Sequence, residues 1–279
     1  MTKSFVYFGT PYVSGDTLEH LLSQGYRPEL VVTSPDAPKG RGLILTPSST
    51  KIVATAHDLP VFTPSKLDES ALTHIASFGA DYGIVVAYGK ILPQLLIDLF
   101  PLGLINVHYS LLPQYRGASP VETALRNGDA VTGVTLQQLV YELDAGPVLA
   151  RKEVPILPSD TMWELRPRLI QEGAQLLVSS LPSFEAGTLA TTPQNLEDAT
   201  HCGKITKAEG ELNLEGDAQS NWNTYRAFAE SPGTFFFAEK NGKQARVKIV
   251  TASFDGSVFT PVRVIPEGKN EILYSDFSR

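Results

Sequence analysis

Two kinds of local pattern alternate along the first part of the chain, and this alternation limits the folds open to it. Strand-like apolar runs lie at 5–8, 30–33, 82–87 and 104–108, and helical periods lie between them at 16–23, 51–56 and 94–100. Strands that alternate with helices are typical of βαβ units, which build a parallel sheet with helices on both faces. We therefore predict an α/β fold with an open, Rossmann-like, mostly parallel sheet.

The same pattern continues to about residue 190. Ser119 and Pro120 are typical of the N-cap and first position of a helix, here over 120–126. Two further strands are predicted at 134–139 and 148–156, and a long amphipathic helix at 163–180. Residues 1–190 are thus predicted to form one domain, which the motifs below mark as catalytic.

A polar stretch at 191–204 is predicted to be a linker, and the pattern changes after it. A helix at 218–229 precedes short strands at 234–238, 245–252, 258–265 and 271–274. Asn241-Gly242 and Asp255-Gly256 are favoured hairpin turns between strands. Residues 205–279 therefore predict a small C-terminal β-barrel-like (OB-like) domain.

Composition excludes several classes of protein. With 42% hydrophobic and 19% charged residues, the chain can build a core. One cysteine, Cys202, and five histidines without H-E-x-x-H spacing argue against a disulfide framework or a zinc site, so no metal is expected. The net charge of -7 argues against nucleic-acid binding by overall positive charge but leaves room for a local basic site. We find neither a signal peptide nor an apolar run of the ~20 residues that span a membrane, and expect a cytoplasmic protein.

Polar residues with complementary chemistry lie at the carboxyl end of the strand at 104–108. Asn106 and His108 are two residues apart, so their side chains point to the same side of that strand. Asp144, in the turn Leu143-Asp144-Ala145-Gly146, could approach the same sheet edge, where open α/β sheets bind ligands. An isolated Asn-x-His is more often structural. Together, a neutral donor, a proton carrier and a carboxylate suit attack of an amine on a carbonyl carbon.

Further motifs connect these residues to a known family. Asn106-x-His108, then Ser110-Leu111-Leu112-Pro113 with Arg116-Gly117, then 143–146 resemble, in this order, the folate-dependent formyltransferase superfamily. Additional segments are similar to the methionyl-tRNA formyltransferase family: 8–11, 35–42, 85–89, 226–228 with 232–233, and 266–269. The match is dense to about residue 156 and patchy afterwards, and the C-terminal domain is short for the family.

The resemblance implies the reaction and the site. Asn106, His108 and Asp144 would form the transfer centre, where the α-amine of methionyl-initiator tRNA attacks the formyl carbon of 10-formyltetrahydrofolate without a covalent enzyme intermediate. Asn106 and a charged His108 would stabilise the oxyanion, and Asp144 would keep His108 charged and move a proton through a water. The folate would contact two segments of the chain, Ser110, Leu111, Leu112 and Pro113 in one and Val86, Ala87, Tyr88 and Gly89 in the other.

The segment 35–42 is the predicted contact with tRNA. Its proline and glycine content predicts an irregular, mobile surface loop that presents Lys39 and Arg41. In the family this loop reaches the acceptor end of the tRNA. Leu43 and Ile44 stand where lysines are common, and residues 205–279 carry nine basic and ten acidic residues, net -1. We therefore expect tRNA binding by the second domain to be modest and salt-sensitive.

Two other functions are consistent with part of the sequence. A sugar N-formyltransferase would keep the folate half and accept a nucleotide-linked amino sugar, but segments 35–42 and 266–269 argue against it. A binding protein that has lost catalysis is disfavoured by Asn106, His108 and Asp144.

Tyr109 replaces a residue that is usually small in the family, which predicts a differently packed folate wall. No coiled-coil seam is visible, so we expect a monomer.

Overall fold

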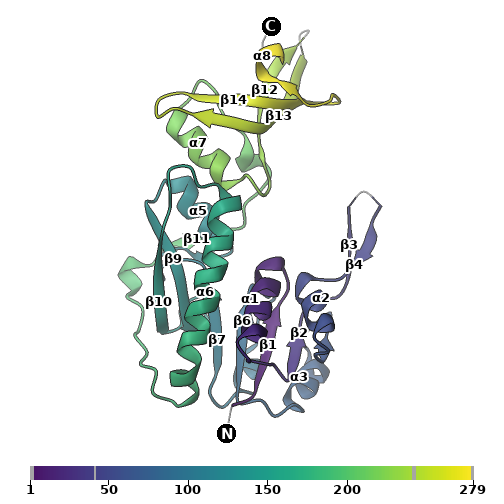
Figure 1. Cartoon of the computed structure of the whole chain (residues 1–279), viewed down its shortest axis with the longest axis vertical. Coiled ribbons are helices and arrows are strands. Elements are labelled where there is room, and N and C mark those ends of the chain that lie inside the picture. The colour runs from purple at the N-terminus through teal and green to yellow at the C-terminus, as the bar shows by residue number, and fades with distance from the viewer. Residues whose placement is uncertain (1–2, 41, 241–242, 278–279) are drawn as a thin grey trace. The chain divides into compact units, whose positions relative to one another are not determined.

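The computed structural model describes residues 3–40, 42–240 and 243–277 and divides into two compact units (Figure 1). The first unit comprises the residues up to 116 together with 133–154 and 167–200. The second comprises 117–132, 155–166 and the residues from 201 on. Residues 191–200, which follow the predicted catalytic domain, belong to the first unit.

A seven-stranded sheet forms the centre of the first unit. Its strand order is β10-β9-β7-β6-β1-β2-β5, with β1 pairing in parallel with β2 and β6, β6 with β7, and β2 with β5, whereas β9 is antiparallel to β7. The strands are β1 (Phe5–Gly9), β2 (Leu30–Val32), β5 (Val61–Phe62), β6 (Tyr82–Val86), β7 (Leu104–His108), β9 (Val131–Gln138) and β10 (Val148–Pro155). The predicted mostly parallel α/β sheet is confirmed.

Helices cover both faces of this sheet because successive side chains of a strand point in opposite directions. Val6 and Phe8 of β1 belong to a buried cluster that includes side chains of α3 and α4. Tyr7 points to the other face and donates a 2.7 Å hydrogen bond to the backbone oxygen of Ser14 in α1. The helices of this unit are α1 (Tyr12–Ser23), α2 (Ser49–Ala56), α3 (Glu69–Ala76), α4 (Gln94–Ile97) and α6 (Met162–Glu185), whose first residues fall in the second unit.

The segment around residue 40 is more regular than predicted. β3 (Ala37–Lys39) and β4 (Ile44–Thr46) pair antiparallel, so the expectation that this segment is too rich in proline and glycine for regular structure is wrong. A three-residue ladder at a free edge tolerates a proline, because an edge strand leaves some backbone groups unpaired. The apolar side chains near the turn stay in solvent, with Leu43 70% and Ile44 72% exposed.

The second unit contains the predicted helix and antiparallel strands. α7 (Ala218–Ala227) packs against α5 (Pro120–Asn127), which begins at Pro120 as predicted. The four-stranded sheet has the order β12-β13-β14-β15. Its strands are β12 (Thr234–Lys240), β13 (Lys243–Phe254), β14 (Phe259–Pro266) and β15 (Ile272–Leu273), and α8 (Tyr274–Phe277) follows them.

One of the two predicted hairpin turns in this sheet, Asp255-Gly256, lies within the described residues. At Asp255-Gly256, the Asp255 carboxylate accepts hydrogen bonds from the backbone N–H of Ser257 and of Val258, and Gly256 has a φ of 100°. The turn between β13 and β14 therefore forms where predicted. Asn241-Gly242 lies outside the described residues.

Within the second unit, a buried arginine connects α7 to residues 155–166. Arg226 of α7 is 5% exposed and donates hydrogen bonds to the backbone oxygens of Leu157, Pro158 and Asp160 and to the side chain of Asn223. Burial lowers the pKa of Arg226. A buried cation is stable only when its donors find acceptors, so this arginine fixes the chain that leads into α6.

Between α6 and α7 the described chain has only short regular elements, one of which pairs with the earlier strand β8 (Arg116–Gly117). They are β11 (His201–Cys202), which forms a two-stranded ribbon with β8, and the short 3-10 turns at Leu196–Asp198 and Ala208–Gly210. Within residues 3–40, 42–240 and 243–277, no helix has the length and apolar character to cross a membrane.

The buried face of β7 should dominate the stability of the first unit. Leu104 is fully buried in the cluster with α3 and α4, whereas Leu95 in α4 is 73% exposed. Leu104→Ala should lower the free energy of unfolding by about 2–5 kcal/mol, because it removes buried methyl groups and leaves a cavity. Leu95→Ala is the control and should change it by less than ~0.5 kcal/mol. Urea unfolding followed by far-UV circular dichroism measures both, and equal losses would contradict the assigned core.

Candidate active site

Three neighbouring parallel strands end at the same edge of the sheet. β1 ends at Gly9, β6 at Val86 and β7 at His108, and these strands lie side by side in the order β7-β6-β1 (Figure 1). The turns that follow them contain segments 8–11, 86–89 and 109–113. Parallel pairing thus gathers motifs that are about 100 residues apart in the sequence at one place, where α/β sheets commonly bind ligands.

Asp144 meets the two polar side chains of β7. Its Oδ1 accepts a hydrogen bond of 3.3 Å from Nδ2 of Asn106, and its Oδ2 lies 3.6 Å from Nδ1 of His108. The side chains of His108 and Asp144 are only 7% and 9% exposed. The structure therefore brings the three predicted transfer residues together in a largely water-excluded position.

A fourth polar side chain completes this cluster. Gln137 of β9 lies directly opposite Asn106 of β7 in the antiparallel register. Its Nε2 donates a 2.8 Å hydrogen bond to Oδ1 of Asp144, and the residue is 2% exposed. Side chains opposite each other in a strand pair point to the same face, so Gln137 and Asn106 hold the Asp144 carboxylate from adjacent strands.

The backbone oxygen of Tyr115 determines which ring nitrogen of His108 carries a proton. Nε2 of His108 lies 2.9 Å from this oxygen. A carbonyl oxygen can only accept, so Nε2 carries a proton and Nδ1 is the nitrogen that faces Asp144. The 3.6 Å separation between Nδ1 and the carboxylate exceeds a direct hydrogen bond but lies within the range of an ion pair.

The loops at this edge have strained backbones. Among the described residues, five non-glycine residues have a left-handed φ, and three of them belong to these loops: Ala87 (46°), Tyr115 (59°) and Asp144 (50°). Such a conformation costs roughly 1–2 kcal/mol at each residue, and surrounding contacts must maintain it. Strain of this kind concentrates at functional sites, which is consistent with the motifs found here.

The loop that carries Asp144 folds tightly onto β9. The backbone nitrogen of Gln138 donates to the oxygen of Pro147. A Cβ atom on Gly146 would lie 1.7 Å from the backbone oxygen of Gln138. Only glycine permits this approach, which explains the glycine two residues after Asp144.

The segment Ser110 to Pro113 is fixed from below by β9. Thr135 Oγ1 donates to the backbone oxygen of Ser110 and accepts from the backbone nitrogen of Leu112. The side chains of Ser110 and Leu112 are buried, and the Ser110 hydroxyl is used by the backbone oxygen of Gln114. Leu111 and Pro113 are half-buried. This segment therefore offers a ligand its backbone and two apolar side chains.

The second predicted folate segment alternates in exposure. Val86 and Tyr88 are buried, whereas Ala87 and Gly89 face solvent. The Tyr88 ring packs edge-on against Phe8, and burial raises the pKa of Tyr88 to about 12. Its hydroxyl has no hydrogen-bond partner among the described residues. The turn thus presents backbone groups at two positions and anchors itself with the other two.

Tyr109 lies on the face of β7 opposite to the transfer residues. A Cβ atom on Gly173 of α6 would lie 3.4 Å from the Tyr109 ring and 3.4 Å from the side chain of Val107. The absence of a side chain at Gly173 makes room for this large ring. Tyr109 therefore packs toward α6 and not toward Asn106 and His108.

The structure places one of the two predicted tRNA residues. Lys39 is exposed in the hairpin formed by β3 and β4. Arg41 lies outside the described residues. The hairpin is built apart from the three strand ends that carry the transfer residues, so the structure does not bring Lys39 to them.

Three residues of the site were missed by sequence reasoning: Tyr115, Gln137 and Gln194. Tyr115 acts through its backbone, which leaves no side-chain signal. Gln137 could have been found by pairing the predicted strands at 104–108 and 134–139, because that register sets it opposite Asn106. Gln194 donates to the backbone oxygens of Asp144 and Gly146 from 50 residues further along the chain, in a stretch without a motif.

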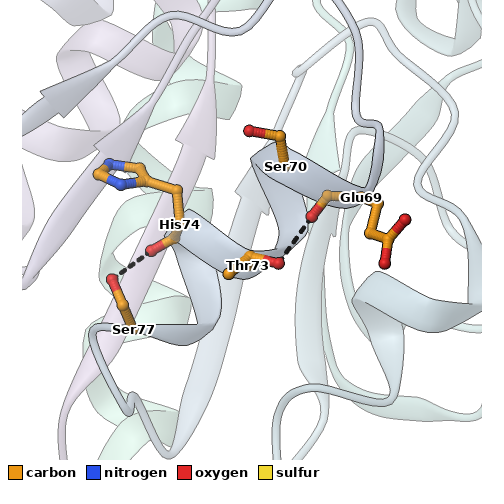
Figure 2. A pocket seen from close by; sticks show the side chains of 5 residues that line it. All are labelled: Glu69, Ser70, Thr73, His74 and Ser77. Atoms are coloured by element: carbon orange, nitrogen blue, oxygen red, sulfur yellow. Dashed lines mark hydrogen bonds between the residues drawn. The ribbon is translucent and has the colours of Figure 1, made fainter.

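A surface hollow beside α3 contains none of these residues (Figure 2). It is lined by Glu69, Ser70, Thr73, His74 and Ser77. Thr73 and Ser77 use their hydroxyls on backbone oxygens of the same helix, and the side chains of His74 and Glu69 point away from each other (Figure 2). The hollow therefore offers no acid–base pair and is a solvated helix face.

Comparison with known proteins assigns the class of this fold and site. The model of the formyl transferase family matches residues 3–181, so the chain belongs to that family. The methionyl-tRNA formyltransferase of Koribacter versatilis (strain Ellin345) is 44% identical over 82% of this chain and 74% of its own length. The methionyl-tRNA formyltransferase of Methylobacterium sp. (strain 4-46) is 40% identical over 100% of this chain and 96% of its own. Within the family, the chain belongs to the methionyl-tRNA formyltransferases.

Solved structures support the fold assignment. The N-formyltransferase from Helicobacter canadensis, in complex with folinic acid and dTDP-3-aminofucose, superposes with a TM-score of 0.65 and covers 92% of this chain and 90% of its own. Its sequence identity is 20%. At this identity the likeness shows a shared fold.

The packing of the Asp144 loop can be tested at Gly146. Gly146→Ala should displace the loop, because the new Cβ would collide with the backbone oxygen of Gln138. A misplacement of about 1 Å at reacting groups costs on the order of 10²-fold in rate, so we expect a loss of that size in formyl transfer. The matched control is Gly203→Ala, where no atom lies within 4 Å of the new Cβ. Equal activity of the two variants in a steady-state assay would contradict the tight packing of this loop.

Proposed function

We propose that this chain transfers the formyl group of 10-formyltetrahydrofolate to the α-amino group of methionyl-initiator tRNA, with Asn106, His108 and Asp144 at the reacting atoms. The convergence of these three side chains at the edge where β6 and β7 end is the observation that carries the proposal. The identity of 44% to a methionyl-tRNA formyltransferase supports the same reaction.

Two donors are available for the oxyanion that forms when the amine attacks. The side-chain amide of Asn106 has two N–H groups and uses one on Asp144, so the second can point at the substrate. Nε2 of His108 is engaged with the backbone of Tyr115, which makes Nδ1 the donor toward substrate. For Nδ1 to donate, the ring must carry protons on both nitrogens, and the Asp144 carboxylate 3.6 Å away is the counter-ion for such a ring.

The reaction also requires one proton to move. A bond forms between the methionyl nitrogen and the formyl carbon, and the bond from that carbon to N10 of the folate breaks. The proton leaves the attacking nitrogen and reaches N10. Asp144 is suited to relay it through a water, because its carboxylate lies beside the transfer position and is 9% exposed.

The folate contacts follow from the exposure of the two segments. The segment Ser110 to Pro113 would contact the folate through Leu111, Pro113 and its backbone. The turn at 86–89 would contact the pterin through the backbone around Ala87 and Gly89, which are exposed. Backbone N–H and C=O groups in a fixed turn recognise a planar heterocycle with little loss of conformational entropy.

The tRNA contacts rest on the hairpin and on the second unit. Lys39 is exposed on β3, and Arg41 follows it in the sequence. Cations there can pair with phosphates of the acceptor end in spite of the net charge of -7. With a tRNA as acceptor, we place the activity in the cytoplasm, and we expect a monomer.

One assay tests the proposed acceptor. The purified chain is mixed with 10-formyltetrahydrofolate and with methionyl-initiator tRNA in one reaction and a nucleotide-linked amino sugar in another. Formylmethionyl-tRNA is the expected product. Formylation of the amino sugar with none of the tRNA would overturn the proposed acceptor.

His108→Ala and Asp144→Asn test the transfer centre. Each should lower formyl transfer by about 10²–10³-fold, because each removes a charge or donor that acts in the transition state. The midpoint of thermal unfolding and the dissociation constant for a folate analogue should show whether the fold and the folate site persist. Near-normal turnover in either variant would rule out its proposed role.

Arg41→Ala tests the hairpin as the contact with tRNA. We expect KM for methionyl-initiator tRNA to rise by roughly 10-fold, since one charge-assisted contact to a phosphate is worth about 1.5–3 kcal/mol. The affinity for the folate analogue should not change. Lys66→Ala removes one positive charge from an exposed position outside the hairpin and serves as the control. An equal loss of affinity for the tRNA and for the folate analogue in Arg41→Ala would indicate misfolding instead.

A further inference from the structure

The stretch 192–200 connects two loops of the transfer centre. Thr192 forms a β-bridge with Val148, directly after the Asp144 loop, through two hydrogen bonds of 2.8 Å. Thr200 forms hydrogen bonds with the loop that contains Pro113 and Tyr115. Its backbone nitrogen donates to the oxygen of Pro113, and its hydroxyl accepts from the backbone nitrogen of Tyr115 at 2.8 Å. This stretch thus runs from the loop that carries Asp144 to the loop whose backbone fixes His108.

The side chain of Gln194 makes the connection at its centre. Its Nε2 donates to the backbone oxygen of Asp144 at 2.8 Å and to that of Gly146 at 2.7 Å. Its Oε1 accepts from Nη2 of Arg116 at 2.8 Å and from Nε at 3.1 Å. Carbonyl oxygens only accept and a guanidinium only donates, so these partners fix the orientation of the amide without ambiguity.

Arg116 gives this connection a rigid base. It is 3% exposed and directly follows Tyr115, whose backbone oxygen bonds His108. One continuous path therefore runs from the His108 ring through the backbone at Tyr115 and Arg116, across the Gln194 amide, to the backbone of Asp144. Two residues on this path, Tyr115 and Asp144, have a left-handed φ. A strained conformation needs such external contacts to persist.

We propose that Gln194 is a positioning residue for formyl transfer, which holds the Asp144 backbone so that its carboxylate remains beside His108 and Asn106. The inference rests on the proposed role of Asp144. Gln194 itself is not placed at the reacting atoms, and its own bonds are to backbone oxygens and to Arg116. Gln137 holds the carboxylate of Asp144, and Gln194 holds its backbone.

Gln194→Glu and Gln194→Ala test this role in the full chain. Glutamate has nearly the same shape and can still accept from Arg116, but it presents oxygen to the backbone oxygens of Asp144 and Gly146 in place of two N–H donors. Gln24→Glu, at the exposed end of α1, introduces the same chemical change far from the transfer centre and is the control. We expect each Gln194 variant to lower kcat by about 10–100-fold, because Asp144 is misplaced. KM for methionyl-initiator tRNA should change less than threefold, and the control should retain wild-type kcat.

A double-mutant cycle separates positioning from a general structural role. Gln194→Ala is combined with Asp144→Asn, and single-turnover rates are measured with enzyme in excess so that slow variants remain measurable. If Gln194 acts through Asp144, adding Gln194→Ala to Asp144→Asn should lower the rate by less than twofold, because the effects of residues that act as a unit are not additive. A full further loss in that background, or a Gln194→Ala variant with near-normal kcat, would overturn the inference. Near-normal turnover of Asp144→Asn alone would instead identify failure of the proposed function of Asp144.

Discussion

The parallel pairing of β1 with β6 and of β6 with β7 is the constraint on which the site depends. Parallel strands all end at the same side of a sheet, so the turns after Gly9, Val86 and His108 meet without any further design. The change to an antiparallel neighbour at β9 has an equally specific consequence. Its register sets Gln137 opposite Asn106 and Thr135 opposite His108, and these two side chains hold Asp144 and the Ser110 segment.

The geometry of the site has an energetic cost that the surrounding packing offsets. Ala87, Tyr115 and Asp144 each adopt a backbone conformation that most residues avoid. Each is flanked by anchored neighbours: Tyr88 is buried beside Phe8, Arg116 is buried against Gln194, and Gly146 packs on the backbone of Gln138. The polar side chains that meet at the candidate site are therefore held in place by the fold, which is the arrangement that preorganised catalysis requires.

Much of this could be predicted from the sequence, and the remainder could not for physical reasons. Apolar runs predicted six of the seven strands of the sheet but missed the two-residue strand β5, and start signals predicted the helix that begins at Pro120. Asn106, His108 and Asp144 were predicted as site residues from their type and order, and the structure brings their side chains together. The contacts of Gln194 depend on a bridge between Thr192 and Val148 and on a backbone path between loops, neither of which leaves a local pattern. The hairpin at 37–46 was missed because composition outweighed the pairing that two short strands can still make.

The distribution of similarity along the chain bears on which amine is accepted. The candidate site consists of the edge formed by β1, β6 and β7 and the loop of Asp144, all of which lie within residues 3–181 that match the family model. An N-formyltransferase crystallised with an amino sugar nucleotide shares this fold at 20% identity. A fold does not by itself select the acceptor, so the acceptor must be selected by side chains in which the two proteins differ. In this chain the hairpin of β3 and β4 and the second unit with its antiparallel sheet lie outside the seven-stranded sheet.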